Sequence, residues 1–510
     1  MKMKWLNFLN FIRYDDFRTP DLDLFEPVRE QMALHRKLAM PATWLMQVDA
    51  MLLGPYVEYF KKNKPADHEL GVWFEINRAH CEKAGVKYNG RPGANWDSHS
   101  NASLSVGYAP EDRLKLADAA MDVFHQAFGY YPATVAAWYI DAVTLDYLNR
   151  KYGVTGSANC RDQWGTDGYS LWGGFWHGAY YPSKVNAYIP ATSEATQIPV
   201  PIFRLLGSCP IDQYASKIGG NGQEVCTLEP VWKDGCQRDW LESFVGNMYG
   251  DVPFEYSFAQ TGQENSFGWA WMKKGFELQI EYFSQLRARG EIICGTMKEA
   301  ADWYRKSFHQ TVPCAVFAKN DVQGKARKSL WYSSRYYRAG VLIEGDQLKI
   351  RDLHLFRADY VDRYQEKTCD DKAMTVDSLP LVEGFLWRKD QEDASAYLEV
   401  NRNGHWEKLD WSGLAVSADE SQHILTLDSG TGVSLVFTGK SLVVNASTTL
   451  CRLVLPKEHV DNPMIQAGGI AYIHRGFYYG ITAAGILKSQ DDGATIFLES
   501  SGGILELGME

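Results

Sequence analysis

The chain has 510 residues, of which 45% are apolar and 23% charged; this is a globular composition and excludes disorder, coiled coil and collagen as the main state. The net charge of −11 argues against non-specific binding to nucleic acid or to an anionic membrane surface. With 17 Trp, 28 Tyr and 23 Phe the chain is rich in flat aromatic faces, which pack large cores and also stack on the C–H faces of sugar rings.

The ends and the cysteines favour a reduced, soluble protein. The apolar stretch at residues 4–12 is short, is interrupted by Asn and has no small-residue cleavage site. No segment reaches the roughly 18 apolar residues that a membrane helix needs. The nine cysteines are scattered and form no C-x-x-C pair. We expect a cytoplasmic protein, and a secreted or periplasmic protein that has lost its signal is the alternative.

Residues 1–315 alternate between strand-like and helix-like segments. Alternation of this kind is typical of a parallel sheet with helices outside, and seven or eight such units in about 300 residues predict a (β/α) barrel, complete or slightly opened. The expected helices are 24–37, 112–128, 142–148, 276–289 and 298–308, and the expected strands are 42–49, 69–76, 134–140, 199–206, 254–258 and 291–294.

From about residue 316 to 510 the pattern changes to short segments that alternate apolar and polar residues. Turn-forming pairs such as Asn403-Gly404 and Asp492-Gly493 lie between these segments. This pattern predicts an antiparallel β-sandwich. We therefore expect two domains, a barrel over 1–315 and a β-rich domain over 316–510, packed together because no low-complexity linker separates them.

Several motifs of the first region resemble a known superfamily. NFIRYDD (10–16), PATWLMQVDA (41–50) and HELGVWFEI (68–76) are similar to successive strands of the barrel shared by polysaccharide deacetylases and by glycoside hydrolases of families 38 and 57. A closer resemblance, to an uncharacterised bacterial family of this superfamily, is carried by CRDQWGTDGY (160–169), LWGG (171–174), YYPS (180–183) and GQEN (262–265). The resemblance implies a carbohydrate-active enzyme.

The metal site of the deacetylases is altered in this sequence. Those enzymes bind a divalent metal with an Asp and two His, and the resemblance places Trp73 and Asn77 at the two His positions. An indole nitrogen is not a metal ligand. We therefore expect no cofactor; a divalent metal held by a replacement set from Asp15, Asp49, His68 or His99 is the alternative.

Glycoside hydrolysis uses two carboxyl groups that face each other across the scissile bond. Barrels of this class place their sites at the C-terminal ends of the strands, so acids just after strands are candidates. The predicted catalytic acids are Glu264, Asp141, Asp49 and Glu75. For each of them a structural role is the alternative: a helix N-cap or a structural ion pair for Asp49, and a helix N-cap for Asp141.

Most substrate-binding candidates lie in the glycine- and tryptophan-rich loops, and Trp73 and Arg204 lie on predicted strands. Aromatic side chains there offer stacking faces, and His177 and Arg204 suit hydroxyl or carboxylate groups, whereas core packing and turn formation are the alternatives. The full set is Trp73, Asp162, Asp167, Trp172, His177, Tyr180, Arg204 and Trp269.

The sequence thus predicts a hydrolase that acts on a carbohydrate substrate, with no nucleic-acid or membrane partner; the oligomeric state is left open. We expect cleavage of a glycosidic bond by paired carboxyl groups, and the resemblance favours an α-linked glycan. The alternatives are a metal-dependent deacetylase and a non-catalytic carbohydrate-binding protein.

Overall fold

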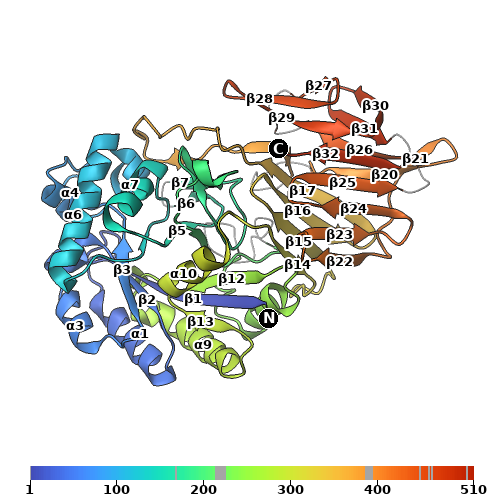
Figure 1. Ribbon diagram of the computed structural model, residues 1–510. Helices are drawn as coiled ribbons and strands as arrows, with labels where there is room; N and C mark the ends of the chain where they lie inside the picture. Colours follow the sequence, from blue (N-terminus) through green and yellow to red (C-terminus); the bar gives the residue numbers. More distant parts are fainter. Residues whose placement is uncertain are drawn as a thin grey trace.

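The computed structural model describes residues 2–510 except 167–168, 213–225, 385–393, 447–449, 458–459, 461–462 and 501–502, and it does not describe the side chains of 164–166 and 487. Figure 1 shows two regions side by side: helices and a parallel sheet on the left, and a region built almost wholly of strands on the right. Within the described residues, no helix combines the length and the apolar character that crossing a membrane requires.

The first region is built on a parallel sheet with the strand order β12-β1-β2-β3-β4, and β13 pairs with β1. Strand β1 is central, and its eight residues from Trp5 to Ile12 are all buried. Strands of parallel sheets are covered on both faces, and this explains the nearly unbroken apolar run at the start of the chain. The bounds are β1 (Met3–Ile12), β2 (Thr43–Met46), β3 (Glu69–Trp73), β4 (Val135–Ala136), β12 (Tyr256–Thr261) and β13 (Ile293–Gly295).

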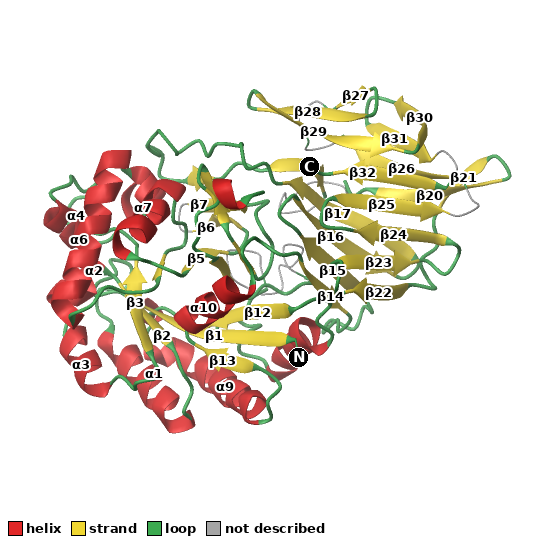
Figure 2. Ribbon diagram, in the orientation of Figure 1, coloured by secondary structure: helices red, strands yellow, loops and turns green. Residues whose placement is uncertain are grey.

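Helices cover the outer side of this sheet (Figure 2). Helix α6 shows how the sequence sets their ends: it begins with Pro110, whose missing N–H is not needed in the first turn, and it stops at Gly129, which adopts a φ of 82°. The helices are α1 (Phe25–Leu38), α2 (Val48–Leu53), α3 (Tyr56–Asn63), α4 (Arg78–Ala84), α5 (Ser100–Ser103), α6 (Pro110–Phe128), α7 (Ala142–Tyr152), α8 (Arg238–Val245), α9 (Trp269–Ala288) and α10 (Met297–Ser307).

The barrel that we expected is present only in part. Strand β5 (Ser157–Cys160) continues the parallel order beyond β4 through a bridge between Thr134 and Gly156, and β11 (Ile202–Leu205) pairs parallel with β5. The other edge of β11 is taken by β8 (Ala179–Tyr180), which runs antiparallel. The ring centroids of Phe203 on β11 and Phe258 on β12 lie 4.7 Å apart, but no described backbone ladder joins the two strands, and closure of the barrel is not seen. Two small sheets complete this region, with β6 (Gln163–Thr166), β7 (Tyr169–Leu171), β9 (Pro182–Ser183) and β10 (Asn186–Pro190).

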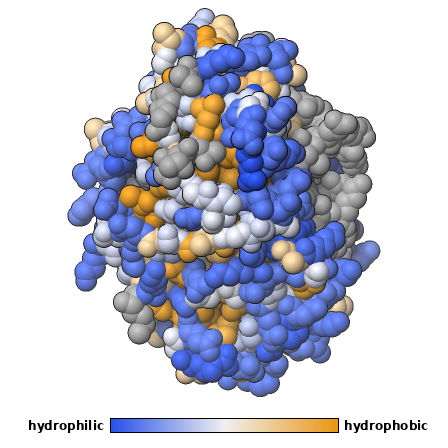
Figure 3. Space-filling model, turned by 90° about the vertical axis from the view of Figure 1, so that its right-hand side faces the viewer, coloured by the Kyte–Doolittle hydropathy of each residue, from blue (hydrophilic) through white to orange (hydrophobic). Residues whose placement is uncertain are grey.

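The second region consists of antiparallel sheets, as the sequence predicts. The sandwich arrangement is supported in part, since the ring of Tyr332 on β15 (Lys328–Ser333) stacks on that of Phe437 on β24 (Val433–Phe437), with ring centroids 5.7 Å apart. On the face that lies to the right in Figure 1, the described surface is mostly hydrophilic, with smaller apolar areas in between (Figure 3).

The described antiparallel strands of the second region form three sheets. One sheet holds β14 (Cys314–Ala318), β15 (Lys328–Ser333), β16 (Tyr337–Glu344), β17 (Gln347–Leu355) and β19 (Leu379–Glu383). A second holds β21 (His405–Lys408), β20 (Tyr397–Arg402), β26 (Cys451–Pro456), β31 (Thr495–Ser500) and β30 (Ile486–Asp491). The third holds β22 (Ala415–Asp419), β23 (Ile424–Asp428), β24 (Val433–Phe437), β25 (Ser441–Ala446), β32 (Ile504–Gly508), β29 (Phe477–Ala484), β28 (Gly469–His474) and β27 (Met464–Gln466).

A segment of the second region, residues 356–378, returns to the first. Its short strand β18 (Met374–Thr375) pairs parallel with β7. Near it, Ser100 N donates to Lys372 O (3.0 Å), and the Arg113 guanidinium donates to Tyr364 O (2.8 Å). Residues from both sides of position 315 therefore build the loops that follow β3 and β4.

A buried network of charges also joins the two regions. Arg338 on β16 contacts Asp162, which follows β5, and its Nε donates to Asp352 Oδ1 (2.9 Å). Asp162 also accepts from Arg204 Nη2 (2.9 Å), and Asp352 pairs with His354 Nδ1 (2.9 Å). Buried charges are tolerated when each has an opposite partner, and here every member has at least one.

His354 makes the stability of this network depend on pH. Burial opposes a charge on the ring, but the neighbouring Asp352 outweighs burial and raises the pKa of His354 to about 9. An unfolded His titrates near 6.5, so the stabilisation is complete below about pH 6.5 and is lost as the pH rises through 9. We expect the difference in unfolding free energy between the protein and its His354→Gln variant to shrink from pH 6 to pH 9.5 in urea titrations. A difference that stays constant over this range would contradict the charged state.

Candidate functional site

Two of the predicted acids meet on one buried arginine. Arg13 directly follows β1; its Nη2 contacts Glu75 Oε2 (2.9 Å) and its Nη1 contacts Glu264 Oε2 (3.0 Å). Glu75 follows β3 and Glu264 follows β12, so all three side chains lie at the C-terminal edge of the parallel sheet. Because both oxygens contact one planar guanidinium group, they lie within about 8 Å of each other. Glycosidases separate their paired carboxyl groups by about 5–9.5 Å.

Glu75 is held by nitrogen donors on several sides. Gln47, which follows β2, donates to Glu75 Oε2 at 2.6 Å, and Trp73 Nε1 donates to the same oxygen at 3.1 Å. Burial raises the pKa of the Glu75 carboxyl, Arg13 opposes this shift and the nearby Glu264 adds to it. Its position is therefore fixed by strands β1, β2 and β3 together.

A stack of side chains covers the two carboxyl groups. The guanidinium of Arg13 lies 4.1 Å from the ring centre of Trp96, and that of Arg18 lies 4.8 Å from it. Arg18 also pairs with Asp16 (2.7 Å) and approaches Glu264 Oε1 at 3.7 Å. Burial works against ionisation of Asp16, but Arg18 and Arg13 outweigh it and hold the pKa below its usual range. Because 36% of the Arg18 side chain is exposed, Glu264 lies one side chain below the surface.

Asp49, a third predicted acid, lies beside this group. It is buried in the first turn of α2 and accepts a hydrogen bond from Asn95 Nδ2 at 2.7 Å. Burial raises its pKa to about 7, and the charges of Asp15 and Arg13 act on it in opposite directions. A carboxyl group with this pKa can hold or release a proton near neutral pH. Glu264 and Glu75 thus contact Arg13 directly, and Asp49 lies close enough for the charge of Arg13 to lower its pKa.

Glu229 is a fourth acid of this group, which the sequence did not indicate. It accepts from Gln263 Nε2 (3.4 Å) and pairs with Arg161 Nη2 (3.8 Å), and Arg161 follows β5. Burial raises its pKa, the charge of Arg161 opposes the shift and that of Glu264 adds to it. Glu229 lies in an irregular segment, so the rule of looking just past a strand does not find it.

Buried polar atoms without a hydrogen-bond partner lie at the same edge of the sheet. Among the described residues they include Gln47 Oε1, Gln163 Nε2 and Arg204 Nε. Native proteins pair nearly all such atoms, and exceptions mark places where water or a polar ligand is bound. These positions therefore suit a ligand rich in hydroxyl groups.

Asp141, the fourth predicted acid, has a different set of partners. It is the N-cap of α7 and accepts from Thr144 N at 3.0 Å. Ser105 Oγ (2.5 Å) and Arg113 Nη1 (3.3 Å) also contact its carboxylate. These contacts favour the capping role that the sequence left open, and a catalytic role for Asp141 stays a prediction.

The predicted substrate-binding residues that the structure describes are all buried. Asp162 and Arg204 belong to the charge network, and Asp167 lies outside the described residues. His177 contacts Ser257 near the start of β12, far along the strand from Glu264, and burial lowers its pKa to about 3. Their burial favours core packing over sugar stacking for Trp73, Trp172, Tyr180 and Trp269.

The residues at the positions of the deacetylase metal ligands do not form a set that suits a divalent metal. Among the described residues there is no group of three His, Cys, Asp or Glu side chains that could hold a metal ion. Asn77 caps α4 by accepting from His80 N (2.9 Å). His68 accepts from Trp44 Nε1 (3.0 Å) before the start of β3, so it lies at the opposite edge of the sheet from Glu75.

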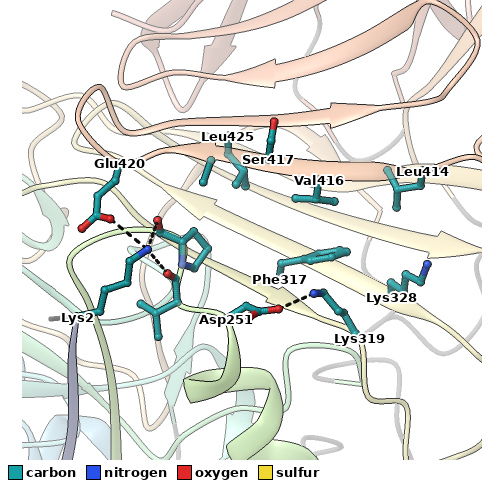
Figure 4. A pocket seen from close by; sticks show the side chains of 13 residues that line it. Lys2, Asp251, Phe317, Lys319, Lys328, Leu414, Val416, Ser417, Glu420 and Leu425 are labelled. Carbon is teal, nitrogen blue, oxygen red and sulfur yellow. Dashed lines mark hydrogen bonds and ion pairs between the residues drawn. The ribbon is translucent and has the colours of Figure 1, made fainter.

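A pocket of about 510 Å³ lies elsewhere, between the two regions (Figure 4). It borders Lys2, just before β1, and thus lies near the N-terminal edge of the parallel sheet. Its carboxylates are paired with lysines, Glu420 with Lys2 (3.3 Å) and Asp251 with Lys319 (2.6 Å). Both ion pairs are partly exposed, so each contributes little to stability, and the Arg13 group remains the stronger candidate site.

No family model matches the chain, and no curated protein matches it. A solved structure described as a glycoside hydrolase/deacetylase from Parabacteroides distasonis is similar, with a TM-score of 0.55 and 12% identity over 76% of this chain and 93% of that chain. This coverage is more than residues 1–315 can supply, so the shared fold extends into the second region.

Two further solved structures are similar only distantly, with TM-scores below 0.5. One is a peptidoglycan deacetylase from Bacillus subtilis (TM-score 0.27, 12% identity, 60% of this chain and 94% of that chain). The other is a GH57 branching enzyme from Thermococcus kodakaraensis (TM-score 0.29, 8% identity, 59% of this chain and 71% of that chain). The resemblance to glycoside hydrolase and deacetylase proteins is confirmed at the level of fold.

Proposed function

We propose that this protein is a hydrolase that cleaves glycosidic bonds of a glycan with Glu264 and Glu75 as its paired carboxyl groups. The observation that supports this most directly is their shared contact with Arg13 at the C-terminal edge of the parallel sheet. One carboxyl group protonates the leaving oxygen, and the other attacks the sugar carbon or activates water. The resemblance to families 38 and 57 favours an α-linked substrate.

Chemical rescue assigns the two roles. Aryl α-glycosides with a good leaving group need little help from the acid, so a variant without its proton donor keeps most of its activity on them. Azide replaces a missing nucleophile and yields a glycosyl azide. We would screen Glu264→Ala and Glu75→Ala on a panel of aryl glycosides with and without azide. Full activity of both variants without azide would refute the pair.

Metal removal separates glycoside hydrolysis from deacetylation. The donor set around Arg13 is suited to ion pairs and not to a divalent metal, so dialysis against a chelator is expected to leave the hydrolysis rate unchanged. The measurement is activity and metal content before and after dialysis. Loss of activity together with a stoichiometric metal, and recovery on adding the metal back, would favour a metal-dependent deacetylase.

One observation favours a second candidate, a non-catalytic glycan-binding protein. Arg13 occupies an oxygen of each carboxyl group, and Trp96 lies over Arg13. If the protein only binds glycans, the purified protein is expected to bind them and to release no reducing ends over long incubation. A reducing-sugar assay alongside binding separates the two candidates.

A further inference from the structure

Trp271 differs from the other tryptophans of the chain. It is 55% exposed, and it is the only exposed Trp among those that the structure describes. A large apolar ring left in water has a cost of about 25 cal/mol per Å² of exposed apolar surface. An exposed large aromatic side chain next to a polar site is thus a candidate contact for a ligand.

Two further aromatic rings hold Trp271 in place. Its ring meets Trp232 edge-to-face with centroids 5.7 Å apart and Phe267 in the same way at 5.3 Å. Its Nε1 donates to Val231 O at 2.9 Å, so the hydrogen-bonding edge of the indole is occupied. We call Trp232, Phe267 and Trp271 the aromatic platform. A ring fixed in this way loses little freedom when a ligand stacks on it.

The platform is joined to the carboxyl groups through two short segments of chain. Phe267 comes three residues after Glu264, and Ser266 between them donates to Glu264 Oε1 at 2.8 Å. Trp232 comes three residues after Glu229. Each segment therefore carries a buried acid at one end and a ring of the platform at the other, and three residues of chain span at most about 11 Å between the Cα atoms of the two.

We infer that the aromatic platform binds one sugar unit of a longer glycan whose scissile bond lies at Glu264. The apolar C–H face of a pyranose matches the flat face of the indole, and the edges of the sugar keep their hydroxyl groups in water. The inference rests on the proposed function and adds that the substrate is an oligo- or polysaccharide. The buried tryptophans at the strand ends do not offer this exposed surface.

Affinity electrophoresis of the full chain tests the inference. Glu264→Gln protein, which leaves the polymer intact, is run in gels that contain soluble starch, pullulan, dextran or xylan. We expect at least one polymer to retard it, and adding Trp271→Ala to weaken the binding about tenfold or more. Trp271→Phe should restore most of the retardation, because a flat ring is kept. Tyr478→Ala is the control, since Tyr478 is 71% exposed on β29 of the second region.

The outcomes separate the platform from the catalytic proposal. Retardation of Trp271→Ala equal to that of the parent, or no retardation of the parent by any polymer, overturns the platform. Loss of retardation in Trp271→Ala together with full hydrolysis by Glu264→Gln overturns the catalytic pair and leaves the platform in place. Circular dichroism of each variant checks that the fold is intact.

Discussion

Glu264→Gln is expected to lower kcat on a cleavable glycan by about 10³-fold or more. A positioned acid, base or nucleophile contributes about 10²–10⁴-fold, and glutamine can neither donate a proton nor attack carbon. Glutamine keeps the size and one carbonyl oxygen of the side chain, so the contact with Ser266 can persist. Initial rates of the purified variant on a glycan whose leaving group is a sugar, and not on an activated aryl glycoside, give the result. Retention of more than a tenth of the activity would contradict the assignment.

Asp141→Asn is the matched control for this experiment. Asp141 is also buried and also follows a strand, but its partners are the first turn of α7 and Arg113. If Asp141 has only a structural role, the variant keeps its kcat; asparagine caps a helix about as well as aspartate, so unfolding free energy is lost mainly through the buried contact with Arg113. If Asp141→Asn lacks activity at unchanged stability while Glu264→Gln is active, the roles are reversed.

Most residues of the candidate site follow parallel strands, which is the position from which the catalytic acids were predicted. Glu264, Glu75 and Asp49 all follow strands; the first two contact Arg13, and the charge of Arg13 acts on Asp49. Arg13 and Gln47 also come directly after strands, but they are not carboxylic acids and were therefore not among the predicted catalytic residues. Asp141 follows a strand as well, and the sequence could not separate an N-cap from a catalytic acid, because both come after a strand and before a helix.

The sequence did not predict which segments that lie far apart in the chain pair with each other. The alternation of strands and helices predicts a parallel sheet, yet β11 pairs with the two residues of β8 and has no described backbone ladder with β12. A two-residue strand has no periodicity to detect. The return of residues 356–378 to the first region likewise depends on contacts more than 200 positions apart, such as Arg113 with Tyr364.

The structure also changes which aromatic residues are candidates for stacking on a sugar. The predicted stacking residues were chosen because they lie in glycine-rich loops, but the described ones are buried there. Trp271 lies in helix α9, and its sequence context did not indicate that its ring is exposed where a ligand could reach it. Burial, and not loop composition, decides which aromatic face is available.

Arg338→Met is expected to cost about 3–5 kcal/mol of unfolding free energy, because removal of one partner from a buried ion pair leaves an uncompensated charge. The Arg338 side chain is fully buried; its Nη2 donates to Asp352 Oδ2 (2.7 Å) and its Nη1 contacts Asp162. Methionine fills similar volume and satisfies neither carboxylate. Urea unfolding followed by circular dichroism measures the loss.

Arg335→Met supplies the matched control, since the same substitution three residues earlier removes a partly exposed guanidinium that lies 5.5 Å from the ring of Tyr336. It should change stability by less than about 1 kcal/mol. Arg338→Lys should fall between the two variants, because an ammonium group keeps the charge but cannot bridge both carboxylates as a planar fork does. An Arg338→Met protein as stable as Arg335→Met would mean that Arg204 and His354 alone compensate Asp162 and Asp352, and that the second region is not held to the first by this network.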